Sequence, residues 1–152
     1  MNKTLTFTVS IAAPRQLVWD TMLDPESYKA WTSVFTEGSY FTGSWDEGSK
    51  IHFLGPDGSG MTAVIAKSTP HEFISIRLLG EISNGVEDTT SEKVRAWAPA
   101  YENYEFADAE GGSTVTVSLD TVPEYVQFML DTYPKALALL KDLCERAVKV
   151  ER

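Results

Sequence analysis

The C-terminal segment, from residue 123 onwards, constrains the fold of this chain more than any other part of the sequence. Its apolar residues recur at steps of three and four, which is the spacing of one stripe along an α-helix. The stripe consists of Val126, Met129, Tyr133, Ala136, Leu140, Leu143 and Ala147. Most of the preceding chain is strand-like, so we expect a β-sheet with one long helix across it. Such an arrangement can enclose a space and suggests a protein that holds an apolar molecule.

Pro134 lies within this predicted helix. A proline there removes one backbone hydrogen bond and bends the helix axis. The apolar stripe nevertheless continues on both sides of it. We therefore expect either one kinked helix or two helices that meet at Tyr133.

Size and charge exclude several classes of protein. A chain of 152 residues has the length of one ordinary domain, so we expect a single domain over residues 1–152. The formal net charge of −9 disfavours phosphate backbones and anionic lipid surfaces, so we expect neither a nucleic acid nor a membrane as partner. The longest apolar run, residues 136–140, is far shorter than the roughly 20 residues that span a bilayer.

Cys144 is the only cysteine, so no disulfide can form within the chain. The start of the sequence also lacks an apolar core of signal-peptide length. Both features are typical of proteins in a reducing compartment, and we expect a cytoplasmic location. Cys144 lies beside Leu143 and Ala147 on the predicted helix, which favours a buried packing thiol over a reactive one.

The pattern before the helix is that of a sheet. Alternating apolar residues between Leu5 and Ile11 predict a first strand. Two short helices follow, one beginning near Pro14 and one after Asp24, a residue suited to capping a helix N-terminus. Further strands are expected over residues 36–42, 50–54, 61–67, 73–81, 100–106 and 114–120. The short turns between neighbouring strands predict an antiparallel meander.

Residues 82–99 depart from this pattern. Thr89 and Glu92 have the spacing of a capping box, which predicts a short helix over about residues 90–97. One interpretation of the segment is a long solvated loop. The other is a lid that places Trp97 over the mouth of a cavity, because long loops are often functional.

Four short stretches carry a resemblance to a known superfamily. They are, in chain order, Ile11–Trp19, Asp24–Trp31, Gly48–Phe53 and Ala136–Lys141. Together they resemble the SRPBCC (START-like, Bet v I-like) superfamily, and the chain looks closest to the branch related to activators of heat-shock-protein ATPase. The resemblance implies the α+β helix-grip fold, in which a curved antiparallel sheet wraps around the long C-terminal helix and two short helices follow the first strand. Members include lipid and hormone binders, polyketide cyclases and co-chaperones, so the resemblance does not imply one function.

Candidate ligand-binding residues are those suited to line the space beneath the helix, where aromatic rings and methionine make a pliable apolar surface. They are Trp31, Phe41, Phe53, Met61, Ile65, Arg77, Trp97, Tyr104, Met129, Tyr133 and Leu137. If Arg77 points into the cavity, its charge needs a partner, either an anionic ligand group or one of the carboxylates Glu102 and Glu105. The sequence leaves open whether these three residues face the cavity or form an ion pair on the outer face.

No motif for a metal, a cofactor or a catalytic nucleophile stands out. His52 and His71 lie too far apart for a metal-binding helix motif, and no nucleophilic serine motif is present. We therefore expect no metal, no cofactor and no assigned catalytic residue.

We expect a protein that binds a small hydrophobic or amphipathic molecule between the sheet and the C-terminal helix, without catalysis. One alternative is a small enzyme of cyclase, dehydratase or hydrolase type that uses Arg77, Glu105, Tyr104 or His52 in the same pocket. A third alternative is an interaction module of co-chaperone type, whose protein partner the sequence does not identify.

Overall fold

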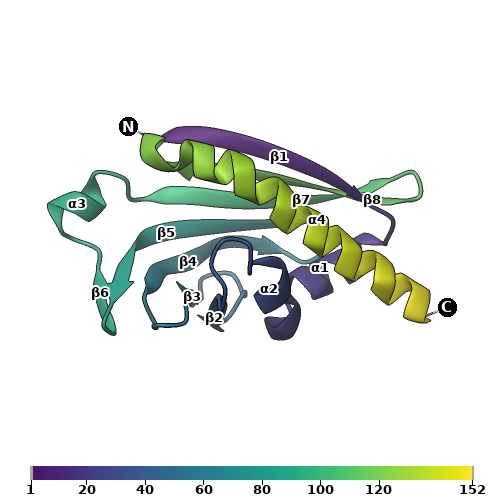
Figure 1. Cartoon of the computed structure of the whole chain (residues 1–152), viewed down its shortest axis with the longest axis horizontal. Helices are drawn as coiled ribbons and strands as arrows, with labels where there is room; N and C mark the ends of the chain where they lie inside the picture. The colour runs from purple at the N-terminus through teal and green to yellow at the C-terminus, as the bar shows by residue number, and fades with distance from the viewer. Residues whose placement is uncertain (1, 152) are drawn as a thin grey trace.

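The computed structural model describes residues 2–151, with side chains as far as residue 149, and consists of one antiparallel sheet with a long helix across it (Figure 1). The strands are β1 (Lys3–Ile11), β2 (Tyr40–Gly43), β3 (Lys50–Leu54), β4 (Gly60–Thr69), β5 (Phe73–Ser83), β6 (Val86–Asp88), β7 (Ala100–Ala109) and β8 (Gly112–Thr121). The helices are α1 (Arg15–Leu23), α2 (Pro25–Trp31), α3 (Glu92–Arg95) and α4 (Val126–Glu151), and a single 3-10 turn, Pro123–Tyr125, leads into α4.

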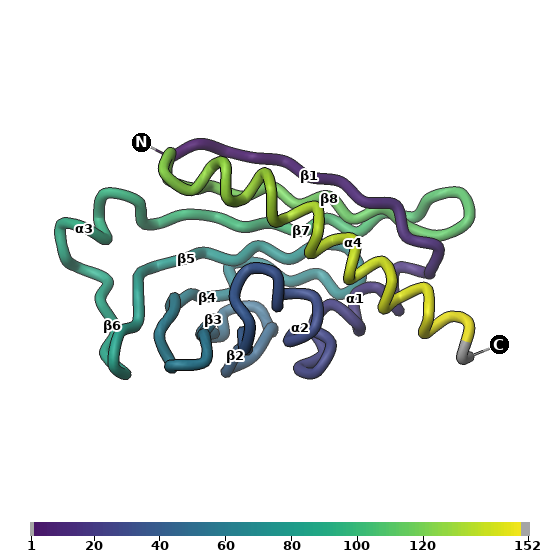
Figure 2. Tube along the Cα trace, in the orientation of Figure 1, coloured from purple at the N-terminus to yellow at the C-terminus, as the bar shows by residue number. Residues whose placement is uncertain are grey.

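The eight-stranded sheet has the order β1-β8-β7-β5-β4-β3-β2, with β6 paired to β5, and every pair is antiparallel. The short helices α1 and α2 pack against α4, and α1 also contacts β7 and β8. Figure 2 shows β1 and α4, from the two ends of the chain, running side by side. This arrangement is the predicted α+β helix-grip fold.

The helix α4 buries the predicted stripe and is unbroken at Pro134. Tyr133, Ala136 and Leu140 are buried, whereas Pro134 is exposed. The carbonyl of Leu130, which a residue other than proline would have bonded, lies on the exposed side of the helix, where water can satisfy it. Of the two predicted alternatives, the structure therefore has one helix.

Local capping sets the start of α2. The Asp24 carboxylate accepts hydrogen bonds from the backbone N–H groups of Glu26 and Ser27 at 3.1 and 3.0 Å, as the sequence predicted. The strand predicted over residues 36–42 is wrong at its beginning. Residues 32–39 instead form turns, and β2 starts at Tyr40. One turn is closed by the hydrogen bond from Phe35 N to Thr32 O at 3.0 Å, and another by that from Ser39 N to Thr36 O at 3.2 Å.

The segment 82–99 contains a strand that the sequence did not predict. Asn84 and Gly85 both have positive φ, 53° and 78°, and their turn folds β6 back on β5. Gly80 permits this pairing, because a Cβ there would collide with the Asp88 carbonyl. The helix α3 is also shorter than expected, since the Ser91 side chain caps it by accepting a hydrogen bond from Val94 N.

Two groups of buried side chains fill the space between the sheet and the helices. One lies among α1, α2, α4 and the strands β1, β7 and β8, and the other lies on β3, β4 and β5. Trp19, Phe41 and Phe53 pack against both groups and join them into one core. Within residues 2–151, none of the helices combines the length and the apolar character that crossing a bilayer requires.

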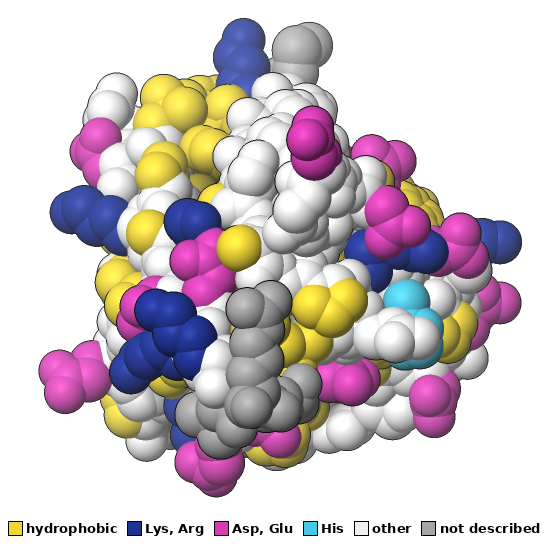
Figure 3. Space-filling model, turned by 90° about the vertical axis from the view of Figure 1, so that its right-hand side faces the viewer, with side chains coloured by type: hydrophobic (Ala, Val, Ile, Leu, Met, Phe, Trp, Pro, Cys, Tyr) yellow, Lys and Arg dark blue, Asp and Glu magenta, His cyan; other side chains and the backbone are white. Residues whose placement is uncertain are grey.

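The surface carries charges of both signs. Figure 3 shows the end of the molecule where α4 finishes, and acidic and basic side chains are interspersed over it. No continuous basic surface is present on this face.

Candidate functional site

A carboxylate occupies an otherwise apolar row on the inner face of the sheet. Glu102 of β7 stands between Leu119 on β8 and Ile76 on β5, and the row continues to Ile65 on β4. Apolar side chains pack in such a row at no electrostatic cost, whereas a carboxylate taken out of water must find hydrogen-bond partners. Glu102 is therefore the chemically distinctive residue of the interior.

Two tyrosines supply those partners. The Tyr104 hydroxyl donates a hydrogen bond to Glu102 Oε2 at 2.8 Å, and the Tyr133 hydroxyl, which comes from α4, donates to the same oxygen. The two hydroxyls also contact each other. We call Glu102, Tyr104 and Tyr133 the carboxylate–tyrosine cluster. When both tyrosines donate to Glu102, neither has a proton left for the contact between the two hydroxyls.

Burial shifts the titration of these groups. Burial raises the pKa of Glu102 and outweighs the hydrogen bonds from Tyr133 and Tyr104, which act in the opposite direction. Burial and the charge of Glu102 together raise the pKa of both tyrosines well above the usual range. The same two causes raise the pKa of Tyr28, which shows that this hydroxyl also senses the Glu102 charge.

Aromatic rings cover the cluster on the side of α4. Phe7 of β1 stacks on Tyr133 with ring centroids 5.1 Å apart, and Phe35 meets the Tyr133 ring edge-on at 5.0 Å. The ring of Phe35 also lies 6.4 Å from that of Phe128, which is 43% exposed. Phe35, in the turns before β2, therefore stands between the cluster and the solvent.

A second group of rings lies next to the cluster and is here called the aromatic group: Tyr28, Trp31, Phe41, Trp45 and Phe53. The Tyr28 and Phe41 rings are 5.0 Å apart, and the Phe41 and Trp45 rings are 5.2 Å apart. Trp31 Nε1 donates to the carbonyl of Met22 at 3.1 Å. Trp45 Nε1, in contrast, is buried and has no hydrogen-bond partner among the described residues. This donor is available to an oxygen atom of a bound molecule.

The structure brings most of the predicted ligand-binding residues into this interior. They are Trp31, Phe41, Phe53, Met61, Ile65, Tyr104, Met129, Tyr133 and Leu137. Phe41, Phe53 and Met61 form one row across β2, β3 and β4. Trp97, which follows α3, packs against the core group on β3, β4 and β5.

Arg77 does not face the interior. Ile76 and Leu78 are buried on the inner face of β5, and alternation along the strand places Arg77 between them on the outer face, exposed and opposite Tyr101. Glu105 is exposed on β7 by the same alternation. Among the described residues, no ion pair joins Arg77 to a carboxylate. Of the two arrangements that the sequence left open for Arg77, the structure has the position on the outer face, without an ion pair to Glu102 or Glu105, and the interior carboxylate belongs to the tyrosines.

His52 also lies on the outer face, in a polar cluster that the sequence did not predict. Its Nε2 is 2.8 Å from Glu87 Oε1, an oxygen that also accepts a hydrogen bond from Thr62 Oγ1 at 2.7 Å. Lys50 Nζ donates to the other oxygen of Glu87 at 2.8 Å. The hydrogen bonds from Lys50, Thr62 and His52 lower the pKa of Glu87 to about 2. The sequence did not reveal this cluster because it did not predict β6, and the pairing of β6 with β5 places Glu87 beside these side chains.

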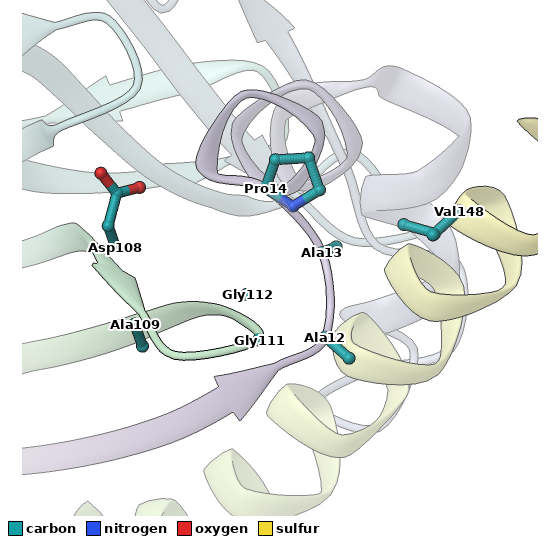
Figure 4. Close-up of a pocket in the computed structure, with 8 residues that line it drawn as sticks. All are labelled: Ala12, Ala13, Pro14, Asp108, Ala109, Gly111, Gly112 and Val148. Atoms are coloured by element: carbon teal, nitrogen blue, oxygen red, sulfur yellow. The ribbon is translucent and has the colours of Figure 1, made fainter.

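The predicted internal cavity is not confirmed. One hollow on the described residues, of about 420 Å³, lies where β1 leads into α1, beside the β7–β8 turn and Val148 of α4 (Figure 4). A second hollow, of about 310 Å³, opens on the outer side of β5. Neither contains a residue of the carboxylate–tyrosine cluster or of the aromatic group.

The arrangement is suited to proton transfer and to binding a polar group, and not to holding a metal. Within the described part of the chain, no three His, Cys, Asp or Glu side chains are placed to bind a metal ion. Glu102 can accept or donate a proton, and each tyrosine can donate a hydrogen bond to a ligand oxygen. The sequence did contain the signal for this site, because Glu102, Tyr104 and Phe106 alternate on one face of a strand, but it did not show that Tyr133 meets them.

Comparison with solved structures finds several proteins with a similar fold. Protein MLL2253 from Mesorhizobium loti superposes with a TM-score of 0.71 at 11% identity, covering 95% of this chain and 98% of that one. CalU16 from Micromonospora echinospora gives 0.67 at 14%, covering 97% and 80%. The AHSA1-like protein from Aeromonas hydrophila gives 0.64 at 15%, covering 95% and 94%.

At these identities the solved structures show the fold alone, and no curated protein sequence matches the chain. The family itself is shown by a match to a family model. The model described as "Activator of Hsp90 ATPase homolog 1-like protein" matches residues 12–132, which is more than half of the sequence. The chain belongs to the family of proteins similar to the activator of Hsp90 ATPase homolog 1.

Proposed function

We propose that the interior beneath α4 binds a small amphipathic molecule, with its polar end on the carboxylate–tyrosine cluster and its apolar part among the aromatic group. The observation that carries this proposal is the position of Glu102 on the inner face of the sheet. A leucine or an isoleucine there would continue the row of Leu119 and Ile76 at no electrostatic cost. Shifted carboxyl groups in apolar surroundings are characteristic of functional sites.

A ligand must open the interior in order to enter it. The route with the fewest contacts to break passes Phe35, since this ring belongs to a segment of turns rather than to a strand or a helix. Movement of Phe35 would uncover the Tyr133 hydroxyl, and displacement of rings in the aromatic group would expose the unpaired Trp45 N–H. Burying apolar ligand surface stabilises the complex by about 25 cal/mol per Å², and the cost of this opening reduces that gain.

A second candidate function is catalysis by the same cluster. The raised pKa of Glu102 favours a protonated carboxyl, which is suited to donate a proton to a substrate oxygen, and Tyr104 and Tyr133 are placed to stabilise the charge that develops. This version replaces the predicted use of Arg77, Glu105 and His52, which lie on the outer face. Conversion of a bound compound that stops in a Glu102→Gln variant would favour the enzyme.

The proposal is tested by native mass spectrometry of the purified protein, followed by a thermal-shift screen with hydrophobic alcohols, ketones and phenols. A compound present at about 100 times its Kd stabilises the folded state by about 2.7 kcal/mol. For a domain of this size that corresponds to an increase in Tm of roughly 5–10 °C.

Matched variants on one strand then locate the binding site. Glu102→Gln and Tyr104→Phe change the inner face of β7, whereas Glu105→Gln and Tyr101→Phe make the same chemical changes on its outer face. We expect the inner variants to weaken binding of the compound by about tenfold, an effect typical of one lost hydrogen bond, and the outer variants to leave it unchanged. The absence of any hit, or equal effects of both sets of variants, would overturn the proposal.

A further inference from the structure

The outer hollow lies on the face of the sheet opposite to α4, between β5 and the segment that carries α3. Its volume is about 310 Å³. Its lining residues are Arg77, Leu79, Thr89, Arg95, Ala98 and Pro99. It shares no residue with the carboxylate–tyrosine cluster, so anything it binds is independent of the function proposed for the interior.

Two arginines lining this hollow have no carboxylate partner. Among the residues that the structure describes, Arg15 and Arg146 each pair with an aspartate, at 2.9 and 2.8 Å, whereas Arg77 and Arg95 form no ion pair. The sequence contains 22 Asp and Glu residues against 13 Lys and Arg, so acidic partners are abundant. A shortage of acidic residues therefore does not explain why Arg77 and Arg95 form no ion pair.

Two of the nearby acidic groups are directed to other donors, and Glu92, three residues before Arg95 on α3, forms no ion pair among the described residues. Glu81 pairs with Lys93 at 3.1 Å. Asp88 accepts from the backbone N–H groups of Thr90 and Ser91 at 3.2 and 3.0 Å. Both acidic side chains thus have donors of their own, and the two guanidinium groups remain available to a ligand.

Asp120, on β8, is occupied in the same way. It accepts from Tyr101 N at 3.0 Å and from Thr4 Oγ1 at 2.8 Å. Tyr101 is the cross-strand neighbour of Arg77. Asp120, which lies beyond Tyr101 as seen from Arg77 across the sheet, therefore also has other donors.

The other residues that line the hollow are uncharged. Leu79, Ala98 and Pro99 form an apolar wall, and Thr89 adds a hydroxyl. A guanidinium presents a planar fork of donors that matches the two oxygens of a carboxylate or a phosphate. We propose that the outer hollow binds a small organic anion, a carboxylate or a phosphate monoester, whose charged end lies between Arg77 and Arg95 and whose apolar body rests on Leu79 and Pro99.

Titrations followed by the backbone amide and arginine Nε–H signals in NMR spectra test this inference. The probes are benzoate and phenyl phosphate, with inorganic phosphate and neutral benzyl alcohol as comparisons. We expect saturable shifts of the signals of Arg77, Leu79, Thr89 and Arg95 with one or both organic anions, and binding at least about tenfold weaker for inorganic phosphate and benzyl alcohol. Comparison of benzoate with phenyl phosphate identifies the preferred anion.

Variants distinguish a specific binding site from nonspecific electrostatic attraction. Arg77→Gln and Arg95→Gln should each weaken binding at least about tenfold, and Arg77→Lys, which keeps the charge and loses the fork, should weaken it nearly as much. Lys135→Gln removes one positive charge from the exposed side of α4 and should leave binding unchanged. Shifts that do not saturate, equal binding of inorganic phosphate, or equal losses in the Arg77→Gln and Lys135→Gln variants would each overturn the inference.

Discussion

At Glu102, burial and hydrogen bonding act in opposite directions on one carboxyl group. Burial disfavours the charged form, while the Tyr104 and Tyr133 hydroxyls favour it, and burial prevails. The folded protein therefore holds the Glu102 proton to a higher pH than an ordinary carboxyl group does.

The pH dependence of stability follows from this shift. The Glu102 carboxyl titrates near its ordinary value of 4.5 in the unfolded chain and at a higher pH in the folded protein, so the folded state holds the proton more tightly. The stabilisation is complete below about pH 4.5 and is lost as the pH rises through the folded-state pKa. Glu102→Gln should remove this loss, and its free energy of unfolding should exceed that of the wild type by about 1–3 kcal/mol above that pKa.

Urea denaturation of both proteins between pH 4 and pH 9 measures the difference. Glu105→Gln, on the exposed face of the same strand, is the control, and its stability should stay within about 0.5 kcal/mol of the wild type. A Glu102→Gln variant that is less stable than the wild type at every pH would show that the ionised carboxylate is favourable in the core.

At the scale of the element, α4 is stabilised by the apolar face it presents to the sheet. Leu139 and Leu140 are consecutive in sequence and differ in surroundings, with exposed fractions of 37% and 0%. Leu140→Ala should lower the free energy of unfolding by about 2–5 kcal/mol because it leaves a cavity in the core, and Leu139→Ala should lower it by less than about 1 kcal/mol. Guanidinium denaturation compares the two, and equal losses would contradict the packing described for this helix.

The strand β6 is attached to the sheet through Glu87 as well as through its backbone. The ordinary pKa of this carboxyl is 4.5 and its folded-state value is about 2, so its contribution is present above about pH 4.5 and is lost as the pH falls toward 2. Glu87→Gln keeps an oxygen for Thr62 but loses the ion pair with Lys50. We expect faster amide hydrogen exchange over residues 86–88 in this variant at neutral pH.

An exposed glutamate in the β7–β8 turn provides the control for that measurement. Glu110→Gln removes the same charge at a distance from β6 and should leave the exchange of residues 86–88 unchanged. Carbon-13 NMR titration of the Glu87 side chain gives its pKa directly, and an ordinary value near 4.5 would mean that these hydrogen bonds do not persist in solution.

At the scale of the whole molecule, the first strand and the last helix of the chain pack together, because α4 lies on β1 as well as on α1 and α2. Undocking of α4 would therefore expose the core rather than a margin of the protein. Cys144 lies on the buried side of this helix with an exposed fraction of 0%. Burial raises the pKa of its thiol to about 11, which confirms the predicted packing role.

This single thiol reports the opening of the whole molecule. A thiol reagent should modify Cys144 in the native protein at least about a thousandfold more slowly than in denaturant, since exposure requires α4 to leave the core. The modification rate should rise with urea in step with global unfolding, and Cys144→Ser should show no reaction. Rapid modification in the absence of urea would show that α4 opens on its own.

Much of the fold could be predicted, because the periods of apolar residues are local properties of the chain. The stripe from Val126 to Ala147 predicted α4, and Asp24 predicted the start of α2. Strand β6 was missed because three exposed or half-exposed residues, Val86–Asp88, carry no alternation of burial. The Asn84–Gly85 turn was the only local sign of it.

The sequence by itself determined the sheet, the long helix and the alternation that puts Glu102, Tyr104 and Phe106 on one face of β7, since side chains on a strand must alternate. Only the tertiary structure decided that Tyr133, 31 residues away, donates to Glu102, that Arg77 lies outside, and that the two hollows described lie away from the space beneath α4 where a cavity was expected. These outcomes depend on strand register and on the distance between helix and sheet. Both are set by contacts between remote parts of the chain, and no local pattern records them.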